Sequence, residues 1–152
     1  MESLLIGCDN AAFALKQIVM QLLDSRNIPY EDVGVYAPED GRMYPLIAQS
    51  VATEIERSGF MRKGILLCGT GIGMAIAANK FKGIYAAVCH DAFSAERAKL
   101  SNNANVLTMG ARVIGPELAK KIVLEWLSHE FGPSSSLPKV EAIRSFEEKN
   151  FK

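Results

Sequence analysis

The sequence has no excess of charge of either sign, because 17 Lys and Arg residues are balanced by 17 Asp and Glu residues. Proteins that bind nucleic acid or an anionic membrane surface carry a basic excess, so no nucleic-acid or membrane partner is expected. Long hydrophobic runs are also lacking, and neither a membrane-spanning helix nor a signal peptide is expected. We therefore expect one soluble domain over residues 1–152, located in the cytoplasm by default.

Cysteine and histidine are scarce as well. The three cysteines, Cys8, Cys68 and Cys89, cannot all pair within one chain, and each ends a short apolar run. Reduced thiols are therefore expected rather than a disulfide framework. The few candidate ligands do not follow the spacing of a metal site, so no metal is expected. His129 is expected late in a helix, in contact with solvent.

Short β-rich segments alternate with amphipathic helical segments along the chain. Strands are expected at residues 4–8, 32–36, 64–68, 84–89 and 105–109. Helices are expected at 12–24, from Pro45 to a stop at Ser58 and Gly59, and from the glycine-rich residues 69–73 to near Lys80. Further helices are expected at 92–100, from Pro116 onward and at 140–150. Residues 37–42 are turn formers and are expected to be a loop. Five strands joined by crossover helices predict an α/β fold with a parallel, doubly wound sheet.

In a sheet of this kind, ligands bind beyond the carboxyl ends of the strands. Four polar or glycine-rich segments are expected at that edge: Asp9-Asn10, residues 68–73, His90-Asp91 and the segment after Leu100. Asp9 and Asp91 also directly precede predicted helices, where an aspartate is a favoured N-cap. Position alone therefore leaves ligand binding and helix capping open for both.

The most informative segment is Cys68-Gly69-Thr70-Gly71-Ile72-Gly73-Met74, between a buried strand and a helix. Glycines allow a ligand to approach the backbone, and the helix start offers unpaired N–H groups, so the loop is suited to an anion. A dinucleotide phosphate is one candidate, although the glycine spacing is not that of the usual fingerprint. The other is a developing oxyanion beside Cys68, whose thiolate the helix start favours. The alternative is that Cys68 is a small core residue, as expected for Cys8 and Cys89.

Residues 64–80 resemble the signature of the ribose-5-phosphate isomerase B and galactose-6-phosphate isomerase family. The resemblance covers nearly the whole chain through Gly7-Cys8-Asp9, Tyr44-Pro45, Asn102-Asn103-Ala104-Asn105-Val106 and Gly110-Ala111-Arg112. It implies a Rossmann-like three-layer α/β/α sandwich with no metal or organic cofactor. It also implies homodimers or dimers of dimers with shared active sites, in which a C-terminal helix at about 139–150 packs on a partner subunit.

Members of this family interconvert phosphorylated aldoses and ketoses by moving a proton between C1 and C2 through a cis-enediolate. The resemblance implies that Cys68 is the base and that Thr70 and the loop N–H groups bind the enediolate oxygen. In some relatives a glutamate in the following helix is the base; here that position is Met74. The substrate-binding residues implied are Asp9, Asn10, Tyr44, Gly69, Gly71, Gly73, Asn102, Arg112 and Lys139.

The chain departs from the family pattern at the positions that handle the sugar ring and the phosphate. Ser101 replaces the ring-opening histidine, which points to a substrate that arrives acyclic; a tetrose 4-phosphate cannot form a furanose because its O4 is esterified. Asn10 replaces a histidine that contacts phosphate. Two arginines that flank a histidine before the last helix are replaced, which leaves Lys139 as a point charge beside Ser135 and Ser136.

Three functions are compatible with these residues. The leading hypothesis is an aldose–ketose isomerase of a small sugar phosphate, of the ribose 5-phosphate type or with a tetrose or other altered substrate. The second is a non-catalytic sugar-phosphate-binding or regulatory subunit, although such subunits tend to lose the cysteine and glycine loop. The third is a nucleotide-binding module.

Overall fold

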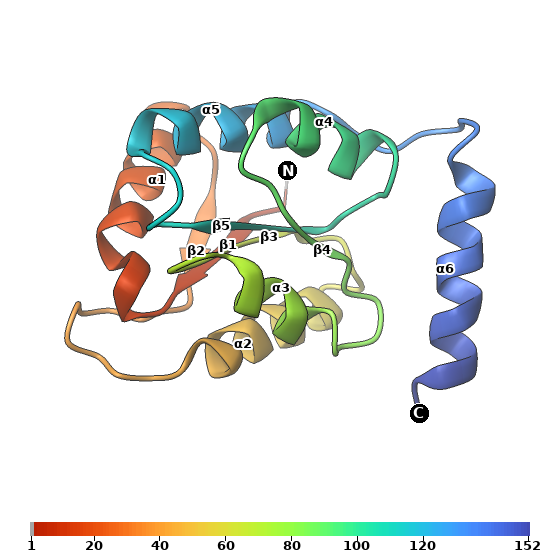
Figure 1. Cartoon of the computed structure of the whole chain (residues 1–152), viewed down its shortest axis with the longest axis horizontal. Coiled ribbons are helices and arrows are strands. Elements are labelled where there is room, and N and C mark those ends of the chain that lie inside the picture. Colours follow the sequence, from red (N-terminus) through yellow and green to blue (C-terminus); the bar gives the residue numbers. More distant parts are fainter. Residues whose placement is uncertain (1) are drawn as a thin grey trace.

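The computed structural model describes residues 2–152, and its centre is a five-stranded sheet in the order β2-β1-β3-β5-β4 (Figure 1). All neighbouring strands are parallel, which confirms the predicted sheet type. The strands are β1 (Leu4–Cys8), β2 (Tyr30–Asp32), β3 (Gly64–Cys68), β4 (Ala86–Val88) and β5 (Val106–Gly110). Every residue of β1, β3 and β5 is buried, because parallel strands are covered by helices on both faces.

The helices form a layer on each face of the sheet. They are the 3₁₀ turn η1 (Asn10–Ala12), α1 (Phe13–Ser25), α2 (Tyr44–Arg57), α3 (Ile72–Ala78), α4 (Ala92–Leu100), α5 (Pro116–Leu127) and α6 (Leu137–Asn150). Helices α1, α4 and α5 cover one face and α2 and α3 the other, so the three-layer arrangement is confirmed (Figure 1). Helix α6 stands apart from these layers, at one end of the sheet.

Two edge strands differ from their predicted ranges. The strand expected at 32–36 is β2 at Tyr30–Asp32. Val33, Gly34 and Val35 still exchange backbone hydrogen bonds with β1, but Gly34 has a φ of +103°, which is not the extended geometry of a regular strand. The strand expected at 84–89 is the shorter β4, and its residues are not fully buried because it lies at the edge of the sheet. The helix predicted at 92–100 is confirmed as α4.

The direction of each helix decides which loops meet at which edge of the sheet. Segments that follow strands lie at the carboxyl edge, and each crossover helix returns the chain to the amino edge. The segment after Leu100 follows α4 and therefore lies at the amino edge, where the carbonyl of Asn105 accepts a hydrogen bond from the N–H of Gly64 at 2.9 Å. The expectation that this segment lies at the carboxyl edge was wrong.

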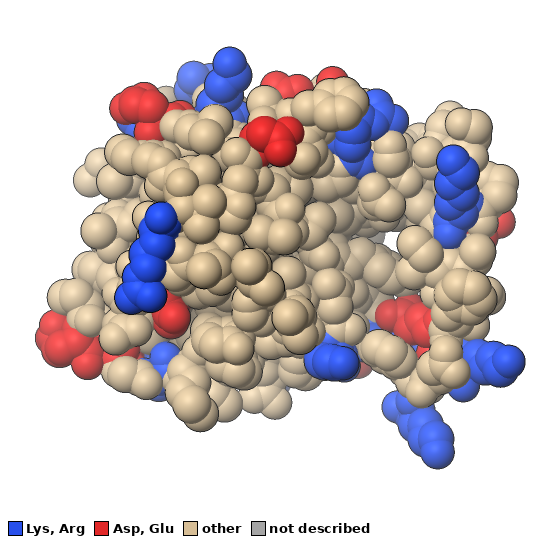
Figure 2. Space-filling model, in the orientation of Figure 1, with Lys and Arg blue, Asp and Glu red and all other residues tan. Residues whose placement is uncertain are grey.

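The surface agrees with the balanced composition. On the face seen in Figure 2, basic and acidic side chains are scattered and do not gather into a patch of one sign. Within residues 2–152, none of the helices has the length and apolar character needed to span a membrane.

Candidate active site

Cys68 is the last residue of β3, and its side chain is buried at 4% exposure. The backbone N–H of Gly71 donates a hydrogen bond to its Sγ at 3.1 Å. An N–H donor stabilises negative charge on the atom that accepts from it. The glycine loop therefore folds back onto the thiol at the point where the sheet opens to ligands.

The loop can make this contact because it packs directly on the backbone of β5. Gly71 has φ of +78°, and a Cβ at this position would lie 2.8 Å from the carbonyl carbon of Met109. A Cβ on Gly110 would lie 2.5 Å from the backbone of Thr70. Neither position can take a larger residue without a shift of the backbone. The two glycines therefore hold Thr70 and the loop N–H groups against the end of β5.

Tyr44 and Arg112 cover the loop from two different segments. The ring of Tyr44, at the start of α2, lies 2.5 Å from the place that a Cβ on Gly73 would occupy. One Nη of Arg112 lies 3.2 Å from the corresponding place on Gly69, and the Arg112 N–H donates to the Gly69 carbonyl at 3.0 Å. An aromatic ring and a guanidinium group thus lie on a loop that has no side chains of its own at these positions.

Asp9 reaches the same edge from β1. Its N–H donates to the carbonyl of Leu67 at 3.2 Å, which places it beside the end of β3. One carboxylate oxygen accepts from the N–H of Ala11 at 3.1 Å, so the capping role left open by the sequence is confirmed. The other carboxylate oxygen accepts no hydrogen bond from the described residues and is available to a ligand. Asn10 follows as the exposed first residue of η1.

Three residues predicted for the site are not brought to this edge within one chain. Ser101 directly follows α4, and its hydroxyl accepts a hydrogen bond from Nε of Arg97 at 2.9 Å. Asn102 follows it, at the amino edge. Lys139 lies on α6, which contacts the segment before β4 through Glu147. These three side chains can meet Cys68 only if a second copy of the chain supplies them.

A family model described as ribose/galactose isomerase matches residues 4–143. The chain belongs to this isomerase family. It is 48% identical over 147 residues to a D-erythrulose-4-phosphate isomerase of Pectobacterium atrosepticum, covering 97% of this chain and 96% of that one. It is 47% identical over 145 residues to a ribose-5-P isomerase B of Listeria innocua, covering 95% of this chain and 97% of that one. A solved ribose-5-phosphate isomerase B of Mycoplasma genitalium with bound ribulose-5-phosphate matches with a TM-score of 0.92 at 30% identity, over 97% of each chain.

The other two cysteines of this isomerase-family chain differ from Cys68. Burial is the main cause that raises the pKa of Cys8 to about 11, and the same holds for Cys89. Neither is followed by a glycine loop. Both are buried free thiols, which confirms their prediction as core residues.

The histidines have structural partners. Nε2 of His90 accepts a hydrogen bond from the N–H of Gly110 at 2.9 Å, and Asp91 caps α4 by accepting from the N–H of Ser94 at 2.7 Å. The hydrogen bonds from Ser94 lower the pKa of Asp91. His129 lies just beyond α5 and contacts Glu125 at 2.8 Å. Capping therefore accounts for Asp91.

One group of possible metal ligands comes together that the linear spacing does not show. Glu96 from α4 lies beside Glu125 and His129, with ligand atoms within 4.8 Å of one another. The group lies between α4 and α5, away from the glycine loop. The contact between His129 and Glu125 and the ion pair between Glu96 and Arg97 at 3.8 Å already explain these three side chains.

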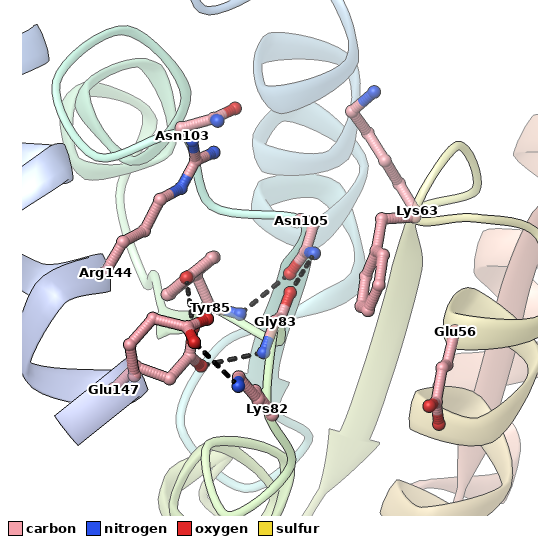
Figure 3. A pocket seen from close by; sticks show the side chains of 11 residues that line it. Glu56, Lys63, Lys82, Gly83, Tyr85, Asn103, Asn105, Arg144 and Glu147 are labelled. Carbon is pink, nitrogen blue, oxygen red and sulfur yellow. Dashed lines mark hydrogen bonds and ion pairs between the residues drawn. The ribbon is translucent and has the colours of Figure 1, made fainter. Parts of the chain in front are cut away.

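One cavity of the structure lies away from Cys68. It measures about 540 Å³ and is bounded by α6 and the segments that precede β3, β4 and β5 (Figure 3). In it, Glu147 accepts hydrogen bonds from the Gly83 N–H and the Tyr85 hydroxyl, both at 2.7 Å. Burial, followed by this contact with Glu147, raises the pKa of Tyr85 to about 12. The cavity holds no cysteine and no part of the glycine loop, so we assign the chemistry to the carboxyl edge.

Sequence reasoning missed one residue at the carboxyl edge. Arg42 belongs to the loop interpreted only as turn-forming residues, yet its guanidinium group lies against Gly34, next to the end of β1. The signal that could have found it is that this arginine stands two residues before Tyr44, the predicted site residue.

Proposed function

We propose that the protein is a cofactor-independent aldose–ketose isomerase of a small sugar phosphate, with Cys68 as the base. The observation that carries the proposal is the hydrogen bond from the Gly71 N–H to the Cys68 sulfur, on a loop covered by Tyr44 and Arg112. The family membership supports it, since isomerases are among the relatives that match almost the full chain.

In the proposed reaction, the Cys68 thiolate removes a proton from the carbon next to the substrate carbonyl. Negative charge develops on the carbonyl oxygen, and the loop N–H groups with the Thr70 hydroxyl stabilise the resulting cis-enediolate. The thiol then returns a proton to the neighbouring carbon while a hydroxyl proton moves between the two oxygens. Atoms and electrons balance within the substrate, so no redox cofactor is needed. Asp9 holds a substrate hydroxyl through its free carboxylate oxygen.

We infer that the complete site belongs to two copies of the chain. Asn102 and Lys139 lie at the amino edge, whereas Cys68 lies at the carboxyl edge, so each copy holds one part of the predicted set. Helix α6 supports this inference, because Val140 is buried while Ile143 and Phe146 remain 43% and 64% exposed. Apolar side chains in a row on a protruding helix are typical of a surface that a partner covers. The same proposal gives a homodimer or a dimer of dimers, and we propose the cytoplasm as its location.

Among sugar phosphates, we propose a four-carbon substrate that is acyclic in solution. Ser101 stands at the ring-opening position, where its hydroxyl accepts a hydrogen bond from Nε of Arg97. Near neutral pH an aliphatic hydroxyl is a much weaker acid and base than the imidazole that it replaces. A tetrose or tetrulose 4-phosphate needs no ring opening. The relative from Pectobacterium atrosepticum, named as an erythrulose-4-phosphate isomerase, supports this choice.

The test is a substrate panel of tetrose, pentose and hexose phosphates, assayed in deuterium oxide. We expect exchange of deuterium at the carbon next to the carbonyl, with tetrose phosphates turned over faster than ribose 5-phosphate. The reverse order would overturn the four-carbon assignment and keep the isomerase. Binding of sugar phosphates without turnover or deuterium exchange would instead identify a non-catalytic binding subunit.

A further inference from the structure

A sugar phosphate brings close to two negative charges to the site, and the family's usual phosphate-binding residues are partly replaced in this chain. Five segments follow strands and therefore line the carboxyl edge: residues 9–12, 33–43, 69–73, 89–91 and 111–115. Their only Lys or Arg residues are Arg42 and Arg112. The nearby Lys16 is fully buried and paired with Asp32 at 2.7 Å, so its charge is already compensated.

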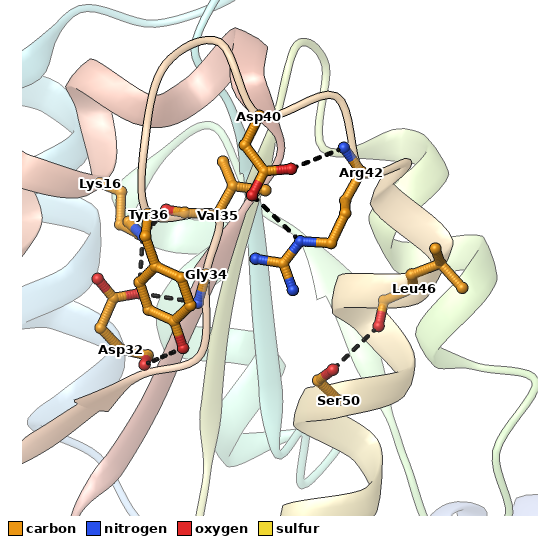
Figure 4. Close-up of polar contacts among 9 residues, drawn as sticks. All are labelled: Lys16, Asp32, Gly34, Val35, Tyr36, Asp40, Arg42, Leu46 and Ser50. Atoms are coloured by element: carbon orange, nitrogen blue, oxygen red, sulfur yellow. Dashed lines mark hydrogen bonds and ion pairs between the residues drawn. The ribbon is translucent and has the colours of Figure 1, made fainter.

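The guanidinium group of Arg42 is held in place with part of its donors free. Asp40 accepts from the Arg42 backbone N–H at 3.0 Å and from Nε at 3.2 Å (Figure 4). The Nη groups donate to no acceptor among residues 2–152. The Tyr36 ring lies 5.7 Å from the guanidinium carbon, a cation–π distance. Asp40 and Tyr36 thus fix the group while its terminal N–H donors remain available.

Arg42 also lies at the correct edge of the sheet. One Nη lies 2.5 Å from the place that a Cβ on Gly34 would occupy, and the Gly34 carbonyl accepts from the Cys8 N–H at 2.7 Å. Gly34 follows β2, which is separated from β3 by β1 alone, so two steps between strands place it roughly 10 Å from Cys68. That separation fits a short sugar phosphate, with its carbonyl carbon at the thiol and its phosphate near Arg42.

We propose that Arg42 binds the phosphate of the substrate through its Nη groups, opposite Arg112. The proposal rests on the proposed function and names the residue that takes over from the missing phosphate contacts. Two parallel N–H donors of a guanidinium match two phosphate oxygens, which a lysine cannot do. Arg42 contacts a part of the substrate remote from the reacting carbons, so its contact is the same in the ground state and the transition state.

The test is Arg42→Gln, assayed with the full-length enzyme and its best sugar phosphate from the panel. Loss of a contact that is equally strong in the ground state and the transition state raises KM and leaves kcat unchanged. In Arg42→Gln, KM should therefore rise about 10- to 100-fold while kcat stays within about threefold of the wild-type value. Arg57→Gln is the matched control, because Arg57 ends α2 at the amino edge and pairs with Glu54 at 2.6 Å. Arg42→Lys should recover only part of the loss. An unchanged KM in Arg42→Gln would overturn the proposal.

Inorganic phosphate separates this inference from the isomerase activity itself. Calorimetric titration of phosphate into the wild-type protein should show binding that Arg42→Gln weakens by a similar factor and Arg57→Gln leaves unchanged. If no sugar phosphate is turned over, the proposed function fails, and the titration still decides the role of Arg42. Equal phosphate binding by wild type and Arg42→Gln, or none by the wild type, would overturn it.

Discussion

The carboxyl edge of the sheet is tightly packed, whereas the amino edge holds a cavity of about 540 Å³. At the carboxyl edge, glycines let Tyr44 and Arg112 lie directly on the loop that carries Cys68. At the amino edge, Glu147 in the cavity beside α6 already accepts from the Gly83 N–H and the Tyr85 hydroxyl, and the glycine loop does not line this cavity. The proposed function therefore rests on the packing of the loop and not on the volume of a cavity. In that proposal the two edges supply different parts of one site.

The sharpest test of this contrast is Cys68→Ala, with Cys8→Ala as its control. Loss of the base should lower kcat by about 10³-fold or more, because no other side chain replaces it. Cys8 ends the neighbouring strand but lacks the glycine loop. Cys8→Ala should therefore change kcat less than threefold, which corresponds to a change of ~0.5 kcal/mol in the activation free energy. Sugar-phosphate binding measured by calorimetry should persist in Cys68→Ala. If Cys68→Ala kept its turnover, Cys68 could not be the base.

The packing of the loop is tested by Gly71→Ala. A Cβ there meets the Met109 backbone at a positive φ, so we expect a loss of about 1–3 kcal/mol in the free energy of unfolding. Displacement of the N–H that donates to Cys68 should also lower kcat by about 10²-fold. Gly41→Ala is the control, since a Cβ at Gly41 meets no atom within 4 Å. Urea unfolding and steady-state kinetics measure both effects, and a Gly71→Ala variant as active as Gly41→Ala would contradict the role of the loop.

The division of the site between two edges is tested by mixing two inactive variants. Cys68→Ala removes the base and Asn102→Ala removes the hydroxyl contact from the opposite edge. Random exchange of subunits gives one intact site in each mixed dimer, so activity should return to about a quarter of the wild-type value. The two variants are unfolded and refolded together, and each is also refolded alone as the control. No gain over the separate samples would show that Asn102 and Cys68 do not form one site across two subunits.

The sequence predicted the fold well where the apolar pattern is strong, and less well at the edges. The buried strand at 64–68 and the helix at 92–100 follow from apolar runs, capping residues and glycine signals. The range predicted for β2 was displaced from the observed one because a strand of three residues has little hydrophobic periodicity. The resemblance to a family supplied the roles of Cys68 and Asn102, but a motif in one chain does not state which edge of the sheet it occupies.

The position of Arg42 shows the same limit at the level of a single side chain. Its loop contains Pro38, Asp40 and Gly41, which are typical turn formers, and the nearness of Tyr44 is the one local signal for Arg42. What places the guanidinium group at the site is the return of this loop over Gly34 and its hydrogen bonds to Asp40, which are tertiary contacts. Only the structure brings these contacts together.

The smallest expected effect is on the pH dependence of stability, and it comes from the buried charge of Lys99. This lysine lies under α5 toward the amino edge. Burial, followed by repulsion from Lys63, lowers the pKa of Lys99 to about 8 from 10.5. Between these values the unfolded chain holds more protons than the folded one, so Lys99 makes the folded state relatively more stable as pH rises from 8 to 10.5. The ammonium keeps a contact with the Trp126 ring at 4.4 Å and a hydrogen bond to the His129 carbonyl at 3.1 Å, which limit the cost of burial.

The measurement compares the free energy of unfolding of wild type and Lys99→Met in urea at pH 7.5 and pH 10. The wild type should gain about 1–3 kcal/mol relative to the variant over this range, since titrations common to both proteins cancel. At pH 7.5 the variant should be as stable as the wild type or more so, because methionine buries no charge. Its kcat should stay unchanged, since Lys99 lies outside both parts of the site. A pH-independent difference in stability would show that Lys99 titrates alike in the folded and unfolded chains.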